Sequence, residues 1–295
     1  MLKQLVMSTK KVEKIIKPGA AHFVGDGFKV HQFIPGEIGM HRLNPFIMLD
    51  YNAAVYFPPS TKQRGVGVHP HRGFETVTIA YQGKIEHQDS SGGGGIIEEG
   101  EVQWMTAAKG ILHKEFHEKK FSAQGGIFQM VQLWVNLPAK YKMSPPKYQA
   151  IKDQDMGVYP IGNQGSLVKI ISGSYKGVKG PASTFSPVTL CNALLKKGDQ
   201  TDFEFPSEYV CAAVVIDGSV LINQKEKVAA HHFILFEQDG STFSVSATED
   251  CILLVLAAEP LHEPIASYGP FVMNTRQEIQ EAFEDYNRGA FGYLD

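Results

Sequence analysis

Short stretches in which hydrophobic and polar residues alternate recur along almost the whole chain. Phe28–Phe33, with the sequence Phe-Lys-Val-His-Gln-Phe, is a clear example. Successive side chains of a strand point to opposite faces, so this alternation is typical of strands with one buried face. Further strands are expected at 45–51, 76–81, 84–88, 101–106, 129–136, 167–171, 188–195, 201–205, 209–217, 219–223, 231–236, 242–246 and 251–257. Turn signals such as Gln82-Gly83 and Asp217-Gly218 separate them, and the pattern predicts an all-β barrel or sandwich.

One segment has helical periodicity. Thr275-Arg276-Gln277-Glu278 forms a capping box, in which the threonine and glutamate side chains bind the backbone N–H groups at a helix start. Ile279, Ala282, Phe283 and Tyr286 follow at helical spacing. The sequence therefore predicts a helix over 275–288 whose apolar face packs against the body of the protein.

The length of 295 residues allows two domains. Prolines and lysines concentrate between 137 and 160, which predicts a linker or crossing segment at 141–160, with domains at 1–140 and 161–295. A β-branched strand ending in a glycine turn occurs at Thr76–Gly83 and again at Val210–Gly218. This weak repeat indicates a duplicated barrel.

Composition excludes several classes of protein. Lys+Arg 28 and Asp+Glu 31 nearly balance, and no basic stripe suggests nucleic-acid binding. Cys191, Cys211 and Cys251 are odd in number and lie among apolar residues, which predicts buried free thiols in a reducing compartment. No stretch is apolar enough for a membrane span, and the first residues lack a cleavage signal, so we expect a cytoplasmic protein.

Candidate chemistry lies between Val68 and His117. His69 and His71 are two residues apart and share one face of a strand, as do His113 and Glu115. If the two strands lie across a barrel from each other, three imidazoles and a carboxylate converge. These ligands suit a divalent transition metal such as Fe, Mn, Ni, Cu or Zn, and the absence of thiolates argues against a structural zinc site.

Structural explanations compete with each of these signals. A single histidine on a strand is usually a hydrogen-bonded residue, but two such motifs, each next to glycines, favour a metal site. The glycines at 92–95 lack the lysine and hydroxyl residue of a phosphate-binding loop, so a flexible hairpin loop is favoured. His231-His232 are adjacent and would point to opposite faces of a strand, so a structural role is favoured for them.

Gly65–Glu75 and Gly110–His113 resemble the two cupin motifs, although one spacing is longer by a residue and a proline is missing from the second. Longer strings resemble the pirin family, and they follow one another in the same order from about Lys29 to the C-terminal helix. They are Asn44–Asp50, His69–Thr76, Gln103–Ala107, Gly110–His113, Gln132–Leu137 and Gly269–Thr275.

The resemblance implies a bicupin, with two β-barrels facing each other and a metal ion in the N-terminal one only. It implies His69, His71, His113 and Glu115 as ligands, which leave about two positions open on a six-coordinate ion. Glu75 would lie behind the ligands and orient an imidazole. For His117 we expect a surface position, with the mouth of the barrel as the alternative.

Some family members resemble quercetin 2,3-dioxygenases, oxidoreductases that cleave flavonols with O2. This implies Fe(II) as the first choice of metal, with Zn, Mn, Ni or Cu as alternatives. Glu115 would act as the catalytic base, and Phe46, Trp104 and Met130 are candidate pocket residues. The alternative is an iron-dependent, redox-sensing regulator that binds a transcription factor or another protein. A third possibility is the same oxygenase chemistry on another substrate.

Overall fold

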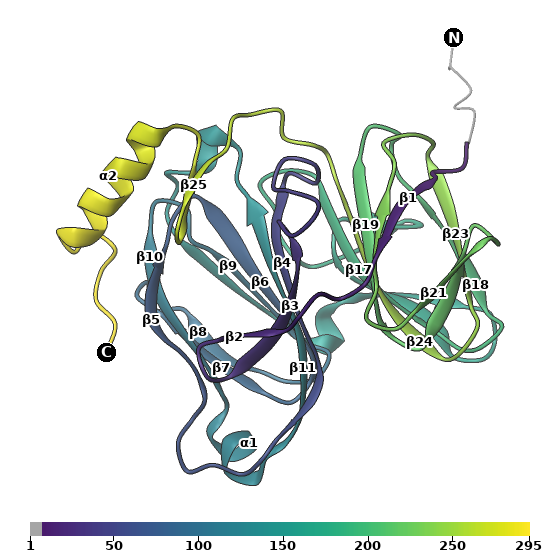
Figure 1. The fold of residues 1–295 in the computed structure, drawn as a ribbon, viewed down its shortest axis with the longest axis horizontal. Helices are drawn as coiled ribbons and strands as arrows, with labels where there is room; N and C mark the ends of the chain where they lie inside the picture. Colours follow the sequence, from purple (N-terminus) through teal and green to yellow (C-terminus); the bar gives the residue numbers. More distant parts are fainter. Residues whose placement is uncertain (1–7) are drawn as a thin grey trace. The chain divides into compact units, whose positions relative to one another are not determined.

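The computed structural model describes residues 8–295, so the first seven residues of the predicted N-terminal domain lie outside it. Two compact units emerge from the backbone contacts. The N-terminal unit comprises Gly19–Asp155 and Leu261–Asp295. The C-terminal unit comprises Met156–Pro260 and residues 8–18. Antiparallel strands build both units, which confirms the predicted all-β class (Figure 1).

The N-terminal unit contains a seven-stranded and a four-stranded sheet. The larger has the order β12-β9-β6-β11-β4-β3-β2, and the smaller has the order β5-β10-β7-β8. The bounds in the larger sheet are β2 His22–Val24, β3 Phe28–Ile34, β4 Phe46–Phe57, β6 Phe74–Gln82, β9 Val102–Thr106, β11 Gly126–Asn136 and β12 Lys147–Ile151. Those in the smaller are β5 Gly65–His71, β7 Ile85–Asp89, β8 Gly94–Ile97 and β10 Ile111–His117.

The C-terminal unit repeats this plan with sheets of seven and four strands. Their orders are β1-β22-β19-β24-β17-β14-β13 and β18-β23-β20-β21. The bounds are β1 Val12–Ile16, β13 Gly157–Ile161, β14 Ser166–Ser172, β15 Ser174–Tyr175, β16 Val178–Lys179, β17 Val188–Leu195, β18 Gln200–Glu204, β19 Val210–Asp217, β20 Ser219–Ile222, β21 Glu226–Ala229, β22 Phe233–Phe236, β23 Thr242–Ala247 and β24 Cys251–Ala258. The two strands of the sequence repeat, β6 and β19, are each third in their large sheet.

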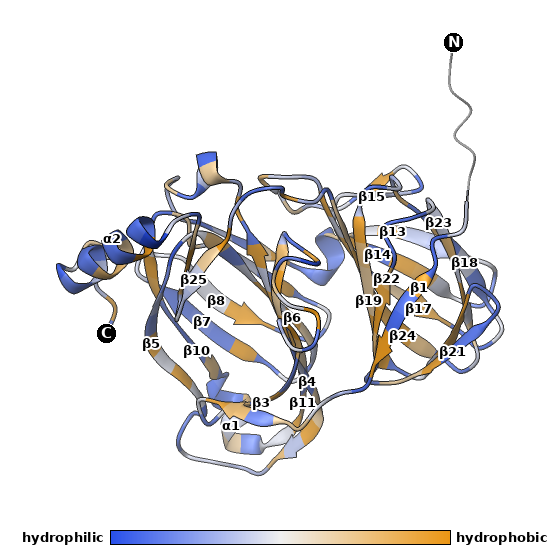
Figure 2. Ribbon diagram, turned by 45° about the horizontal axis from the view of Figure 1, so that its top comes forward, coloured by the Kyte–Doolittle hydropathy of each residue, from blue (hydrophilic) through white to orange (hydrophobic). Residues whose placement is uncertain are grey.

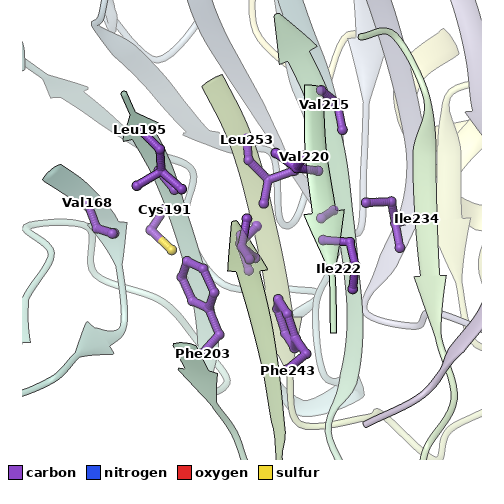
Figure 3. Close-up of a cluster of buried hydrophobic side chains, with 14 of the residues drawn as sticks. Val168, Cys191, Leu195, Phe203, Val215, Val220, Ile222, Ile234, Phe243 and Leu253 are labelled. Carbon is purple, nitrogen blue, oxygen red and sulfur yellow. The ribbon is translucent and has the colours of Figure 1, made fainter. Parts of the chain in front are cut away.

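Apolar side chains fill the C-terminal unit. Figure 3 shows Phe203 and Phe243 from the small sheet beside Cys191 and Leu253 from the large one. The rings of Phe203 and Phe243 stack with centroids 5.2 Å apart. All three cysteines are free and buried, as predicted. His231 and His232 do not lie on a strand, because they form the turn before β22.

The predicted domain boundaries differ from the observed units in three places. β1 pairs with β22, so residues 8–18 join the C-terminal unit. Residues 261–295 belong to the N-terminal unit. The predicted linker 141–160 contains β12 and most of β13, and these two strands belong to sheets of different units. The boundary between the units lies between Asp155 and Met156. Composition did not reveal these pairings because edge strands are short and half exposed.

The helix α2, Arg276–Asn287, begins at Thr275 with the predicted capping box. Its buried residues Ile279 and Ala282 pack with Phe271, Met273 and Phe291. Two short strands precede it, β25 Ala266–Tyr268 and β26 Phe271–Met273. In Figure 2, α2 is mostly hydrophilic, whereas hydrophobic residues concentrate on the strands of each unit. None of the helices in residues 8–295 is both long and apolar enough to cross a membrane.

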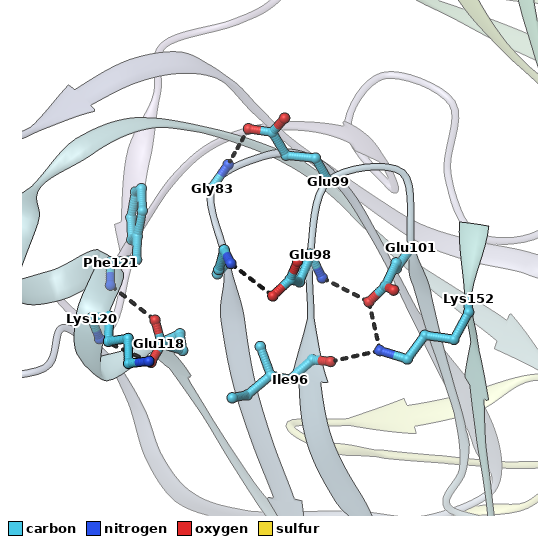
Figure 4. Close-up of polar contacts among 10 residues, drawn as sticks. Gly83, Ile96, Glu98, Glu99, Glu101, Glu118, Lys120, Phe121 and Lys152 are labelled. Atoms are coloured by element: carbon cyan, nitrogen blue, oxygen red, sulfur yellow. Dashed lines mark hydrogen bonds and ion pairs between the residues drawn. The ribbon is translucent and has the colours of Figure 1, made fainter. Parts of the chain in front are cut away.

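A second, unpredicted helix, α1, spans Lys119–Gln124 and is capped by the carboxylate of Glu118. Ion pairs lie around the hairpin formed by β7 and β8 (Figure 4). The Lys84 and Glu98 side chains approach to 2.7 Å, and Lys152 and Glu101 approach to 2.8 Å. Because the lysines are about half exposed, water screens both pairs and they add little to stability.

Candidate metal centre

Strand register brings the predicted ligands together. β5 and β10 pair antiparallel, with His69 directly opposite His113. The two motifs therefore lie on neighbouring strands, and the expectation that they face each other across a barrel is wrong. A Cβ on Gly65 would lie 2.1 Å from the carbonyl oxygen of Glu115, so only glycine permits β5 to approach β10 this closely.

Three imidazoles converge. His69, His71 and His113 each offer a nitrogen, and these atoms lie within 4.8 Å of one another. Glu115 does not belong to this set, but forms a second one with His113 and His87, again within 4.8 Å. His113 is common to both sets, so it is the centre of the cluster.

Burial sets the charge of these groups. It lowers the pKa of His69, and it lowers the pKa values of His71 and His113 well below the usual range, so all three imidazoles are neutral near pH 7. Neutral imidazole is the form that binds metal ions. Burial also raises the pKa of Glu115 to about 7, because a lone carboxylate is poorly solvated there.

The donor atoms fit a metal ion. His113 Nε2 is buried and has no hydrogen-bond partner among residues 8–295. His69 Nδ1 lies 2.8 Å from the carbonyl oxygen of Gly67, to which it donates when Nε2 serves as the ligand. A divalent cation would satisfy His113 Nε2 and offset the cost of burying the Glu115 carboxylate. The His/Glu cluster can therefore hold a metal ion.

Sequence reasoning missed His87. The stretch 84–88 is predicted only as a strand, with no functional residue, yet the His87 side chain is buried in the cluster. Its Nε2 lies 2.8 Å from His113 Nδ1, and its ring stacks on Tyr148 with centroids 5.6 Å apart and an interplanar angle of 11°. The available signal was its spacing two residues before Asp89 on a predicted strand, which alone is weak.

Thr78 shows which face of β6 is turned toward the predicted ligands. Its hydroxyl lies 3.3 Å from Glu115 Oε1 and 2.8 Å from Gln132 Oε1. Glu75 is three residues from Thr78, so its side chain points to the other face of the strand. There its Oε1 accepts a hydrogen bond of 2.7 Å from Thr106. The expectation that Glu75 orients an imidazole is therefore wrong.

The same alternation excludes Trp104 as a pocket residue. Trp104 lies opposite Val77, one residue away from Thr78 on β6, and therefore on the face away from the ligands. The tryptophan beside the cluster is Trp134, whose ring contacts that of His71 edge-on at 5.2 Å. Met130 lies opposite Ala80, on the Thr78 face, and its role in substrate binding stays a prediction. Phe46 lies opposite Val135, which is itself opposite Glu75, so its side chain is on the face away from the ligands and the expectation that it lines the pocket is wrong.

His117 is not a surface residue. It is fully buried, and its Nε2 lies 2.8 Å from the carbonyl oxygen of Gly27. Its ring stacks on Phe128 with centroids 4.4 Å apart and contacts Phe57 edge-on at 4.6 Å. Burial lowers its pKa to about 4, so His117 is a neutral part of the aromatic core.

Two β-barrel units, one of which carries a buried His/Glu cluster that can hold a metal ion, define a bicupin. The Pirin family model matches residues 27–135, and the model for the Pirin C-terminal cupin domain matches residues 190–292. The chain therefore belongs to the pirin family.

The chain is similar to several named proteins over nearly its whole length. A Pseudomonas aeruginosa protein named "Putative quercetin 2,3-dioxygenase" is 46% identical to this chain, and the alignment covers 96% of this chain and 98% of that protein. "Pirin-1" of Arabidopsis thaliana is 33% identical over 98% of this chain and 95% of its own. The crystal structure of a quercetin 2,3-dioxygenase from Acinetobacter baumannii superimposes with a TM-score of 0.92, at 47% identity, and covers 98% of this chain and 100% of its own.

Proposed function

We propose that the protein is a metal-dependent dioxygenase that cleaves flavonols of the quercetin type with O2. The observation that carries the proposal is the convergence of His69, His71 and His113 beside the Glu115 carboxylate, with His113 Nε2 unpartnered among the described residues. The similarity to proteins named as quercetin 2,3-dioxygenases, at 46% and 47% identity, supports the choice of substrate.

In this proposal His69, His71, His113 and Glu115 hold the ion. Fe(II) is the first choice, and Zn, Mn, Ni and Cu ions accept the same ligand types. Four protein ligands leave about two positions of an octahedral ion for small molecules, which distinguishes the site from a closed structural one. When bound, the ion would supply Lewis acidity toward the substrate oxygen and a site for O2.

Glu115 is the proposed catalytic base. The Thr78 hydroxyl lies 3.3 Å from Glu115 Oε1, and this contact restricts the orientation of the carboxylate. In that orientation the carboxylate can accept the proton of the flavonol 3-hydroxyl group. Burial of the cluster excludes water from the oxyanion that this transfer produces. The Met130 side chain is proposed to contact the aromatic rings of the substrate.

Aerobic turnover of quercetin by the Fe(II)-loaded protein tests the proposal. We expect loss of flavonol absorbance with release of carbon monoxide, and no turnover by the His69→Ala/His71→Ala variant. His262→Ala is the control, because His262 is an exposed histidine outside the cluster. Absence of turnover with stoichiometric Fe, Mn, Ni or Cu would reject the flavonol as substrate.

A further inference from the structure

His87 contacts His113 but has no role in the proposed reaction. The polar contact between the two rings joins His87 Nε2 to His113 Nδ1, at 2.8 Å. Both residues are almost completely buried. At this distance one nitrogen must donate a proton and the other must accept it.

The direction of this hydrogen bond decides whether His113 can bind a metal ion. A neutral imidazole carries one proton. If His113 Nδ1 accepts from His87, the His113 proton lies on Nε2, the buried nitrogen that has no other partner among the described residues. If His113 Nδ1 donates to His87, Nε2 keeps a free lone pair and can be a ligand.

The surroundings of His87 hold its ring in place against His113. His87 lies directly opposite Glu115 in the β7–β10 register, which places it beside the ligand strand. The Tyr148 ring stacks nearly parallel to it, and Tyr148 comes from β12 of the larger sheet. The imidazole therefore lies between the two sheets with little freedom to rotate.

We propose that His87 is a positioning residue for the metal ion. Its Nε2 accepts the Nδ1 proton of His113 and so fixes the ring of His113 with Nε2 directed at the ion. Metal-binding histidines usually donate their second nitrogen to a carboxylate, a carbonyl group or water, and here a second imidazole has that function. His87 is not itself a ligand, because its Nε2 lone pair accepts the proton of His113. The inference rests on the proposed metal site but not on flavonol cleavage.

Metal affinity tests the proposal without any turnover. The wild type, His87→Phe and His87→Gln are titrated with Co(II) against a chromophoric chelator, and the visible spectrum of the bound Co(II) is recorded. Phenylalanine can stack on Tyr148 but accepts no hydrogen bond, whereas the glutamine carbonyl can accept the His113 proton. His117→Phe is the matched control, because it removes another buried imidazole of the same unit that contacts no predicted ligand in the described residues.

We expect His87→Phe to lower the affinity about 10–100-fold, the usual effect of losing such a partner, with partial recovery in His87→Gln and no change in His117→Phe. Unchanged affinity and an unchanged Co(II) spectrum in His87→Phe would overturn the proposal. The proposal would also be overturned if the Co(II) spectra of both His87 variants showed the loss of a nitrogen ligand, because His87 would then bind the ion directly.

A measurement on the wild type covers the case in which the variants do not fold. Nitrogen-15 NMR of the zinc-loaded protein identifies which ring nitrogens carry protons. We expect protons on Nδ1 of both His87 and His113, and a proton on His87 Nε2 would overturn the proposal. If zinc and cobalt bind as expected but quercetin is not consumed, the proposed function fails and the role of His87 stands.

Discussion

Replacing Glu75 with glutamine should remove a pH dependence from the stability of the N-terminal unit. Glu75 is buried on the face of β6 away from the ligands, where it accepts a hydrogen bond from Thr106. Burial raises its pKa from 4.5 to about 7, despite the opposing effect of the Thr106 hydrogen bond. Glutamine has nearly the same shape and its carbonyl oxygen can still accept from Thr106, but it does not ionise.

The sign follows from proton binding. Between these two pKa values the folded state holds the proton of Glu75 while the unfolded state has lost it, so folding becomes less favourable as the pH rises. A difference of about 2.5 pKa units corresponds to about 3 kcal/mol when the full interval is crossed. Between about pH 5 and about pH 8, the wild type should lose about 2–3 kcal/mol more stability than Glu75→Gln.

Tryptophan fluorescence can follow this unit alone. The chain has two tryptophans, and Trp104 and Trp134 both lie in the N-terminal unit. Urea unfolding of metal-free protein at the two pH values gives the free energy of unfolding of each form. Other buried groups titrate equally in both forms, so the difference between them isolates Glu75. Equal pH dependence in both would refute the assigned environment of Glu75.

Two further substitutions test contacts around the ligand strands. Thr78→Val removes the hydroxyl that contacts Glu115. We expect the free energy of urea unfolding to fall by about 1–3 kcal/mol and the Co(II) affinity to weaken, and we expect Thr78→Ser to restore both. Asp285→Asn leaves the buried Arg72 guanidinium without its carboxylate partner at 2.6 Å, and we expect a loss of about 3 kcal/mol in the same unfolding assay. Glu98→Gln, which breaks an exposed ion pair with Lys84 in the same unit, should leave stability nearly unchanged, and equal effects of the two variants would contradict this assignment.

Sequence periodicity was sufficient for most strands of the two larger sheets and for the three histidines that converge. His69 and His71 share a face because of their spacing, and alternation alone reveals this. It does not reveal which strand is the neighbour of which, so the arrangement of β5 beside β10 and the exchange of terminal segments between units could not be predicted. Sheet order depends on pairings between residues distant in sequence.

The errors at Glu75 and Trp104 have a common cause. Alternation divides the residues of a strand into two sets, but it does not say which set faces the ligands when both faces are buried. β6 and β9 are buried on both faces, so their sequences carry no polar marker for the outside. For His117 the partner is the carbonyl oxygen of Gly27, far away in sequence, and only the folded chain brings it near.

The position of Glu115 depends on both sheets of the N-terminal unit. The β5–β10 pairing is regular up to His113 and shifts register before Glu115, so the carboxylate is not directly opposite another ligand. Thr78 of the larger sheet contacts Glu115, and Tyr148 of the same sheet packs on His87, which in turn contacts His113. A change in the separation of the two sheets would therefore displace Glu115 and His113 together. Metal affinity should consequently respond to the packing between the sheets as well as to the ligands themselves.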